Sequence, residues 1–274
     1  MVFQALADLE NENDAGVLCT IVRSHGSTPR HSASKMLVYA DGHILGTIGG
    51  GELESRVIQE ALGALREGRP RLLEYNMSDP QSGDPGVCGG QVEIFVEPVL
   101  PKPTLVVIGS GHVGKAVASL AHWLDFRVVV SDDRPEFCTP QAVPDADEYL
   151  LTSLQDLPRH LKITPWTYLV LTTRGVDIDV PGLPALLETP AAYIGVIGSR
   201  RRWATSYKQL LAAGIPEQEL ARIRSPIGLE IEAETPEEIA VSIMAEVIML
   251  RRGGDGSVMS SSVSKASLPE AGSG

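Results

Sequence analysis

The chain has 274 residues, of which 43% are hydrophobic, 21% charged and 5% aromatic. These proportions are those of globular domains, and they exclude fibrous and wholly disordered proteins. The formal net charge is −12 and the sequence pI is about 5.0, so the chain repels phosphate backbones and anionic lipid surfaces. We therefore expect no nucleic-acid partner.

The cysteines and the first residues indicate a cellular compartment. Cys19, Cys88 and Cys138 are too few and too scattered for a disulfide framework. The first residues, MVFQALADLENEND, are acidic where a signal peptide is basic and then apolar. No apolar run in the sequence approaches the roughly 20 residues that span a bilayer. We expect a cytoplasmic protein with no membrane span.

A proline-rich segment divides the sequence. Glu97–Pro103 (EPVLPKP) can continue neither a helix nor a central strand. We interpret it as a linker between a domain of residues 1–100 and a domain of residues 101–252. Residues 253–274 are too poor in apolar side chains to offset chain entropy, so the sequence predicts a disordered tail.

The first domain is predicted to be small and mixed α/β. Its strand candidates are bounded by turn residues, and Asp41-Gly42 is typical of a hairpin turn. One stretch has apolar residues at helical spacing up to Gly68. The prediction is strands at Gly16–Arg23, Lys35–Tyr39 and His43–Ile48, a helix at Glu52–Arg66, and strands at Arg71–Tyr75 and Gln91–Val96.

Strand-like and helix-like segments alternate in the second domain, which predicts βαβ units and a parallel sheet. The strand candidates are TLVVIG, RVVVS, TYLVLTT and AYIGVIG, and helices are predicted at Val113–Leu124 and Ile239–Leu250.

A glycine-rich turn joins the first strand of this domain to its first helix. Gly109–Gly114 fits the pattern GxGxxG. Gly109 and Gly111 allow a tight turn and the close approach of a pyrophosphate, while Gly114 lets the helix pack on the strand. His112 is a candidate ligand contact. We therefore expect an α/β protein in which a small mixed N-terminal domain precedes a Rossmann-like parallel-sheet domain.

Two acids follow this turn. Asp132 and Asp133 lie about 20 residues further on, where a carboxylate would bond a ribose hydroxyl. The neighbouring Arg134 could instead accept a 2′-phosphate. NAD, NADP and a molybdopterin nucleotide all stay open, and so does the alternative that the glycines only fit helix to sheet.

A second glycine-rich turn lies in the first domain. Gly49, Gly50 and Gly51 stand between a strand and a helix, where bared amides can bind an anion. The alternative is that the turn needs glycine only for its backbone conformation. The same alternative applies to a second turn, which lies upstream in the sequence. That turn carries three groups that could bind phosphate, on Ser27, Thr28 and Arg30.

Cys88 stands before two glycines, Gly89 and Gly90, which supply close approach rather than packing. A thiolate there could coordinate molybdenum or carry sulfur, because thiolates are soft ligands and good nucleophiles. We predict a catalytic and metal-binding role for Cys88, whereas Cys19, in an apolar strand, is predicted to be structural.

A basic segment opens a later helix. Gly198–Arg202 combines a helix N-terminus with three arginines, so Ser199 and Arg200 are candidate contacts to an anionic group. A solvated helix face is the alternative.

Together these motifs resemble the xanthine dehydrogenase accessory family, XdhC/CoxI, from about Ala15 to Arg251. The N-terminal marks are GSTPR, KMLV, GTIGGGELE and CGG. The C-terminal marks are VVIGSGHVG, SDDRPEF, YIGVIGSRRR and PIGLEIEAETPEEIAVSIMAE. The resemblance is specific because several independent motifs occur in the same order.

The resemblance implies a maturation factor rather than a metabolic enzyme. Such a protein binds the molybdenum cofactor (molybdopterin) and supports its sulfuration and insertion into a molybdenum hydroxylase apo-enzyme. A cysteine desulfurase and a second copy of the chain are further implied partners. Cys88 and the Gly49–Gly51 turn would lie near the cofactor. Family members typically carry a histidine where this chain has Val176.

Two other functions stay open on the sequence alone. An NAD(P)-dependent oxidoreductase would use the Gly109–Gly114 turn with Asp132 and Asp133, but no motif nominates the proton donor or metal that it needs. A docking module would keep the fold with a vestigial nucleotide site.

Overall fold

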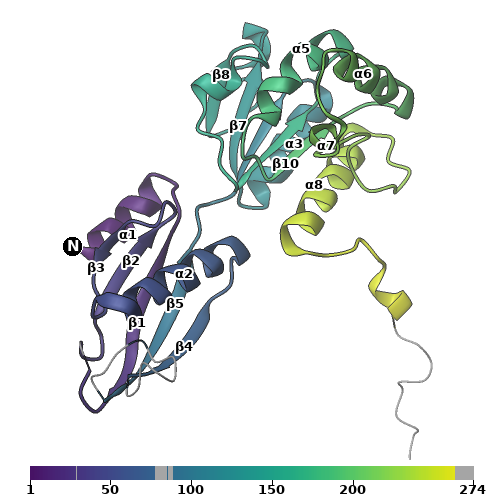
Figure 1. Ribbon diagram of the computed structural model, residues 1–274. Coiled ribbons are helices and arrows are strands. Elements are labelled where there is room, and N and C mark those ends of the chain that lie inside the picture. Colours follow the sequence, from purple (N-terminus) through teal and green to yellow (C-terminus); the bar gives the residue numbers. More distant parts are fainter. Residues whose placement is uncertain (29, 78–84, 86–88, 263–274) are drawn as a thin grey trace, which may run out of the picture. The chain divides into compact units, whose positions relative to one another are not determined.

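The computed structural model of the protein describes residues 1–28, 30–77, 85 and 89–262. The chain divides into two compact units, Met1–Pro101 and Lys102–Gly274, and each is described by itself (Figure 1). Among the described helices, none is long and apolar enough to cross a membrane.

Unit 1 is built on a five-stranded antiparallel sheet with the strand order β3-β2-β1-β5-β4. α1 packs against β2, and α2 packs against β1 and β5. The elements are α1 (Val2–Asn11), β1 (Gly16–His25), β2 (Lys35–Tyr39), β3 (Ile44–Gly46), α2 (Gly51–Glu67), β4 (Arg71–Asn76) and β5 (Gln91–Val99).

Successive side chains of a strand point to opposite faces of the sheet, and this alternation explains how both faces of the sheet are buried. Leu37 of β2 packs with Leu9 of α1. Its neighbour Met36 lies on the opposite face, where it pairs with Cys19 of β1, and both are fully buried. α2 presents Leu53 and other apolar residues at helical spacing, so its buried side faces the sheet.

Several loops extend from one end of this sheet. His25, at the end of β1, pairs with Gln91, at the start of β5. Gly46, at the end of β3, pairs with Met36, near the start of β2. The segments that continue from these strands at this end are Gly26–Thr28, Gly49–Gly51 and Gly89–Gly90.

Unit 2 is built on a six-stranded sheet with the order β11-β10-β9-β6-β7-β8, and all its neighbouring strands are parallel. The first strand, β6, lies in the middle. The chain runs outward through β7 and β8, then returns to build β9, β10 and β11 on the other side, which is the order of a doubly wound nucleotide-binding sheet. The predicted fold class, with a Rossmann-like second domain, is confirmed.

The strands of unit 2 are β6 (Thr104–Ile108), β7 (Arg127–Asp132), β8 (Glu148–Leu151), β9 (Thr167–Leu171), β10 (Tyr193–Val196) and β11 (Ile223–Arg224). The helices are α3 (His112–Trp123), α4 (Leu157–His160), α5 (Val176–Leu187), α6 (Arg200–Ala212), α7 (Glu217–Leu220) and α8 (Pro236–Arg252), with 3-10 turns at Pro135–Phe137 and Met259–Ser262.

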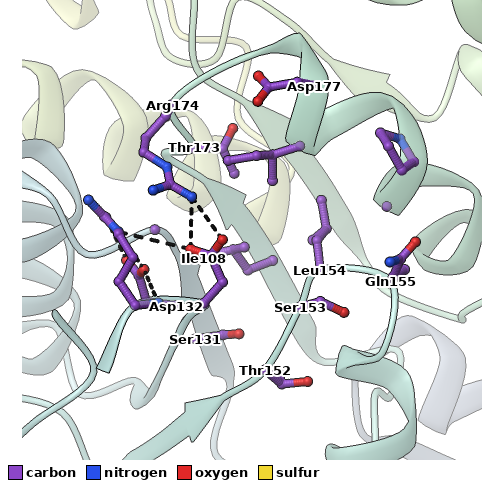
Figure 2. A pocket seen from close by; sticks show the side chains of 16 residues that line it. Ile108, Ser131, Asp132, Thr152, Ser153, Leu154, Gln155, Thr173, Arg174 and Asp177 are labelled. Carbon is purple, nitrogen blue, oxygen red and sulfur yellow. Dashed lines mark hydrogen bonds and ion pairs between the residues drawn. The ribbon is translucent and has the colours of Figure 1, made fainter. Parts of the chain in front are cut away.

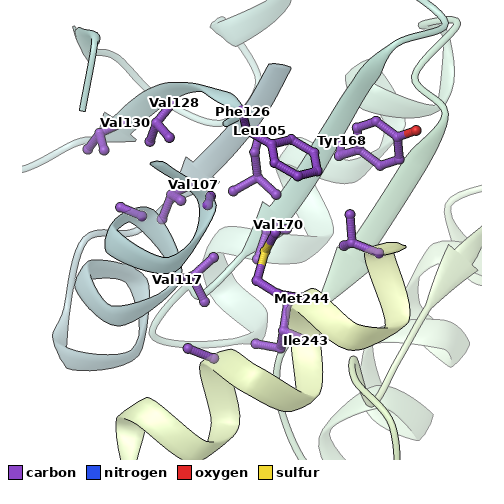
Figure 3. Packing of buried hydrophobic residues seen from close by; sticks show 14 of the residues in the cluster. Leu105, Val107, Val117, Phe126, Val128, Val130, Tyr168, Val170, Ile243 and Met244 are labelled. Carbon is purple, nitrogen blue, oxygen red and sulfur yellow. The ribbon is translucent and has the colours of Figure 1, made fainter. Parts of the chain in front are cut away.

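Helices cover both faces of this sheet. On one face, α3 and α8 pack against Leu105 and Val107 of β6, and Met244 of α8 reaches into this core (Figure 3). On the other face, residues of α4, α5, α6 and α7 pack against Val106 and Ile108. Loops follow the carboxyl ends of the strands.

The predicted linker overlaps the end of β5. The linker is shorter than Glu97–Pro103, because β5 continues through Pro98 to Val99. β4 pairs with β5 only as far as Val96, so β5 is an edge strand at Pro98, where a missing amide proton is tolerated. Within the predicted tail, Met259–Ser262 forms a 3-10 turn, and residues 263–274 lie outside the described residues.

Candidate functional site

Two glycines of the turn between β6 and α3 are required by the protein's own packing. Gly109 has a φ of 95°, and a Cβ there would lie 2.8 Å from the Thr172 carbonyl oxygen. A Cβ on Gly114 would collide with the Gly109 carbonyl oxygen. α3 can therefore approach the strand ends only without side chains at these positions.

Gly111 is different. Its φ is −68°, which any residue adopts, and a Cβ there would meet no atom within 4 Å. Neither the backbone nor the described packing requires glycine at this position. His112 begins α3 and is exposed. The space over Gly111 and the amides that open α3 are thus accessible to a ligand.

Asp132 is buried against this turn, with 1% of its side chain exposed. One carboxylate oxygen accepts a hydrogen bond from the Ser110 amide at 2.8 Å. Arg134 donates to both oxygens, each at 2.9 Å. The Ser110 hydroxyl also donates to the Phe137 carbonyl oxygen at 2.8 Å. Asp132 therefore holds the turn, and both its oxygens are engaged within the protein.

The charge of Asp132 is stabilised by these contacts. Burial raises the pKa of the carboxyl group, but hydrogen bonds from Arg134 and Ser110 outweigh burial and bring the pKa to about 2. The Arg134 guanidinium also lies over the Phe137 ring, 3.7 Å from its centroid. Arg134 is therefore held in place from two sides.

Asp133, the next residue, lines a pocket of about 210 Å³ at the carboxyl edge of the sheet (Figure 2). The pocket lies over the ends of β6, β7, β8 and β9 and the start of α5. The carboxylate of Asp133 is half-exposed, and both its oxygens accept from Arg174 Nη2, at 2.8 and 2.9 Å. Of the two predicted acids, Asp133 is the one whose carboxylate is open to the pocket.

A buried ion pair joins α5 to α6 near this edge. Asp179 is fully buried, pairs with Arg202 Nη2 at 2.6 Å and accepts a hydrogen bond from the Thr173 hydroxyl. Ser199 caps α6 by accepting from the Arg202 amide at 3.2 Å, whereas Arg200 is exposed. Arg200 and Arg201 are the cations of this basic segment that solvent reaches.

In unit 1, the amides of the triple-glycine turn face an internal carboxylate. Glu54 Oε2 accepts from the Thr47 hydroxyl at 2.6 Å and from the amides of Ile48 and Gly50, each at 3.3 Å. The Gly49 amide donates to Thr47 Oγ1 at 3.1 Å. An anionic ligand would reach these amides only by displacing Glu54.

Gly50 and Gly51 have φ values of 76° and 64°, and a Cβ on either would meet no atom within 4 Å. The backbone conformation therefore requires glycine here, while the space beside both residues stays open.

The turn after β1 lies directly against the segment before β5. A Cβ on Gly26 would lie 3.2 Å from the Gly89 carbonyl oxygen, and a Cβ on Gly90 would lie 2.6 Å from the His25 carbonyl oxygen. A Cβ on Gly90 would also collide with the Ser27 carbonyl oxygen. The turn that contains Gly26 and Ser27 is thus in backbone contact with Gly89 and Gly90, although the two segments are far apart in the sequence.

The polar residues of this region are exposed. Ser27 and Arg30 are open to solvent, and the Thr28 hydroxyl donates to the Arg30 carbonyl oxygen at 2.8 Å. Cys88, the candidate catalytic and metal-binding residue, lies outside the described residues. Gly89, which follows it, has a φ of 77°, and a Cβ there would meet no atom within 4 Å.

The two described cysteines are not activated. Cys19 is fully buried in β1, and burial raises the pKa of its thiol to about 12. Cys138 is half-buried, and burial likewise raises its pKa. Among the residues that the structure describes, no group of three His, Cys, Asp or Glu side chains is arranged to hold a metal ion.

Three participating residues were missed by the sequence prediction. Glu54 lies in the first turn of a helix that follows glycines, where an acid can accept the turn's amides, and this position could have revealed it. Asp179 is one of two acids in a mostly apolar helix, a pattern that predicts a buried partner. Ser131, which lines the pocket, carries no comparable signal.

Comparisons with known proteins place the chain in a family. A model described as the XdhC Rossmann domain matches residues 105–247, and a model described as the XdhC and CoxI family matches residues 9–76. The chain is also similar to a crystal structure of a xanthine dehydrogenase from Bacillus halodurans, with a TM-score of 0.50, 25% identity and 97% of each chain covered.

Three curated proteins are similar to the chain. The uncharacterized protein YqeB of Escherichia coli (strain K12) is 39% identical over 260 residues, which cover 94% of this chain and 48% of YqeB. A probable xanthine dehydrogenase subunit of Bacillus subtilis (strain 168) is 34% identical over 159 residues, which cover 58% of this chain and 46% of that protein. The molybdenum cofactor insertion chaperone PaoD of E. coli (strain K12) is 24% identical over 265 residues, which cover 86% of this chain and 83% of PaoD.

The chain therefore spans about half the length of the first two of these relatives. The resemblance inferred from the motifs is confirmed by the two family models, which match unit 1 and unit 2 in turn. The chain belongs to the XdhC and CoxI family.

Proposed function

We propose that this chain is an accessory protein that binds the molybdenum cofactor and supports its sulfuration and its insertion into a molybdenum hydroxylase. The names of two relatives support this role. One is called a molybdenum cofactor insertion chaperone and the other is named as part of a probable xanthine dehydrogenase.

The observation that carries the proposal is the backbone contact between Gly26 and Gly89–Gly90. This contact brings the hydroxyl-bearing turn of Ser27 beside the glycines that follow Cys88. The open space at Gly89, whose φ requires glycine, leaves room for a ligand to approach the backbone.

The chemistry of these residues fits the cofactor. A Cys88 thiolate would be a soft ligand for molybdenum or a carrier of sulfur. Ser27 and Arg30 are exposed and can donate hydrogen bonds to a phosphate group without displacing an internal carboxylate. When bound, the cofactor supplies the metal centre that the partner enzyme uses in its own reaction.

Activation of a partner enzyme tests this function. In cells that produce a xanthine dehydrogenase together with this chain, we expect Cys88→Ala to lower the specific activity of the dehydrogenase about tenfold or more, because a ligand-shell group is lost. The dehydrogenase is purified from each strain, and its activity and molybdenum content are measured.

Cys138→Ala is the matched control, since Cys138 is a half-buried thiol in unit 2 whose Sγ lies 3.8 Å from the Val130 carbonyl oxygen, a weak hydrogen bond. We expect this variant to activate the dehydrogenase fully. Equal activation by Cys88→Ala and by the unaltered chain would remove Cys88 from the proposed function.

A further inference from the structure

A polar cavity lies on the sheet of unit 1, at the end from which the Gly26 and Gly89–Gly90 segments extend. Its volume is about 210 Å³. This lies below the range of about 300–1,000 Å³ that holds whole drug-sized ligands, so the cavity suits one moiety of a larger molecule. Its charged, amide and imidazole side chains come from three neighbouring strands: Arg23 and His25 of β1, Glu74 and Asn76 of β4, and Gln91 and Glu93 of β5.

One row of this cavity places two carboxylates side by side. Arg23, Glu93 and Glu74 are direct cross-strand partners, so their side chains share one face of the sheet. Arg23 Nη1 donates to Glu93 Oε1 at 2.7 Å. No described residue forms a hydrogen bond or an ion pair with the side chain of Glu74. Because like charges directly opposite each other are destabilising, Glu74 weakens the sheet unless a hydrogen-bond donor enters the cavity.

The next row supplies amide groups. His25, Gln91 and Asn76 are also cross-strand partners, and they lie two residues along from the first row, on the same face. Gln91 Nε2 donates to Asn76 Oδ1 at 2.8 Å, which leaves the Asn76 amino group for another partner. His25 precedes Gly26 and Gln91 follows Gly90, so this row borders the two glycine segments that contact each other.

These groups match one edge of a pterin. The 2-amino-4-oxopyrimidine ring at the end of a pterin presents two parallel N–H donors beside a carbonyl oxygen. A carboxylate accepts two such donors in a bidentate arrangement, and a side-chain amino group can donate to the carbonyl oxygen. Glu74 supplies the carboxylate and Asn76 supplies the amino group.

We propose that this cavity binds the aminopyrimidinone end of the pterin of the molybdenum cofactor, with Glu74 accepting from its two N–H groups. The inference rests on the proposed function, since it names the part of the cofactor that unit 1 recognises. The Gly26 and Gly89–Gly90 segments, at the border of the cavity, would then receive the rest of the cofactor.

Fluorescence titration of the full chain with pterin tests the proposal. Pterin carries the aminopyrimidinone ring without metal, sulfur or phosphate. Lumazine has the same two rings with an oxygen in place of the 2-amino group, and would turn a carbonyl oxygen toward Glu74. We expect pterin to bind with a Kd below about 1 mM, and about tenfold or more tightly than lumazine. Absence of pterin binding, or equal binding of the two compounds, would overturn the proposal.

A change at Glu74 locates the ligand. Glu74→Gln should weaken pterin binding about tenfold or more, because an amide cannot accept from both N–H groups. Its urea unfolding midpoint should not fall, since the change removes one of two opposed carboxylates. Glu97→Gln is the control, because Glu97 is exposed on β5 outside the cavity, and it should bind pterin like the unaltered chain. Unchanged pterin affinity in Glu74→Gln would contradict the site.

Cys88→Ala separates this inference from the proposed function. Because pterin has neither metal nor phosphate, Cys88→Ala should bind it like the unaltered chain. If Cys88→Ala activates the dehydrogenase fully while pterin binding depends on Glu74, the role of Cys88 is refuted and the cavity is supported. If the chain carries molybdopterin but binds pterin equally well with and without Glu74, the cavity is refuted and the proposed function stands.

Discussion

At the scale of single residues, Asp132 stabilises unit 2 by joining the glycine turn to the segment after β7. The Ser110 amide and the amide and guanidinium of Arg134 together donate four hydrogen bonds to its carboxylate. The pKa of about 2 lies below the usual aspartate value of about 3.9, so folding favours the ionised form. This contribution to stability is complete above about pH 4 and is lost as the pH falls toward 2.

Asp132→Asn should therefore lower the free energy of unfolding by about 2 kcal/mol at pH 7, as expected for a pKa shift of nearly two units. The difference between the two proteins should narrow below pH 4, where the unaltered carboxylate becomes protonated in the unfolded chain. Urea unfolding at a series of pH values between 7 and 3 measures both effects.

Asp125→Asn is the control for this series, because Asp125 is exposed and has a φ of 63°, which asparagine tolerates. It should change the free energy of unfolding by less than about 0.5 kcal/mol. A deficit in Asp132→Asn that stays constant from pH 7 to pH 3 would show that the charge of Asp132 is not the cause.

At the scale of elements, the start of α2 shows how a glycine turn can hold its own anion. The Glu54 carboxylate accepts hydrogen bonds from two backbone amides and from the Thr47 hydroxyl at the positive end of the helix. Its carboxylate occupies the position that the sequence assigned to an external anion. Whether the turn also binds a phosphate depends on competition between the ligand and Glu54.

Glu54→Ala should free the amides of Ile48 and Gly50 and lower the stability of unit 1 by about 1–3 kcal/mol, the cost of buried donors without partners. Added sulfate should restore the thermal unfolding temperature, because the anion can occupy the vacated turn. Thermal unfolding in sulfate and in chloride at equal ionic strength measures the effect.

Glu52→Ala controls for general effects of sulfate, since Glu52 is in the same helical turn but is exposed and pairs with Arg56, at 2.9 Å. Its unfolding temperature should rise in sulfate by as much as that of the unaltered chain. If sulfate raises the unfolding temperature of Glu54→Ala no more than that of Glu52→Ala, the turn is not an anion site.

At the scale of the whole molecule, periodicity predicted most of the fold. The strand Lys35–Tyr39 has the bounds that the sequence predicts, and the helix predicted at Glu52–Arg66 spans Gly51–Glu67. α1 was missed, although six of its ten residues are apolar. The short strands β8 and β11 were also missed, because two to four residues are too few to show a period.

The candidate site was less predictable, because the roles of its residues depend on partners distant in the sequence. The spacing from the glycine turn singled out Asp132 and Asp133 equally. Only the fold shows that Ser110 and Arg134 occupy the first, while Arg174 pairs with the second. The same holds for Gly90, whose backbone meets Ser27 across the end of the sheet.

The most direct test of the account is the molybdopterin content of the purified chain, measured by fluorescence after oxidation. The chain is produced in cells that make the cofactor and, in parallel, in cells that do not. We expect molybdopterin in the first preparation and a strong decrease in Cys88→Ala, with Cys138→Ala unchanged. A content in the first preparation no higher than in the second would contradict the account.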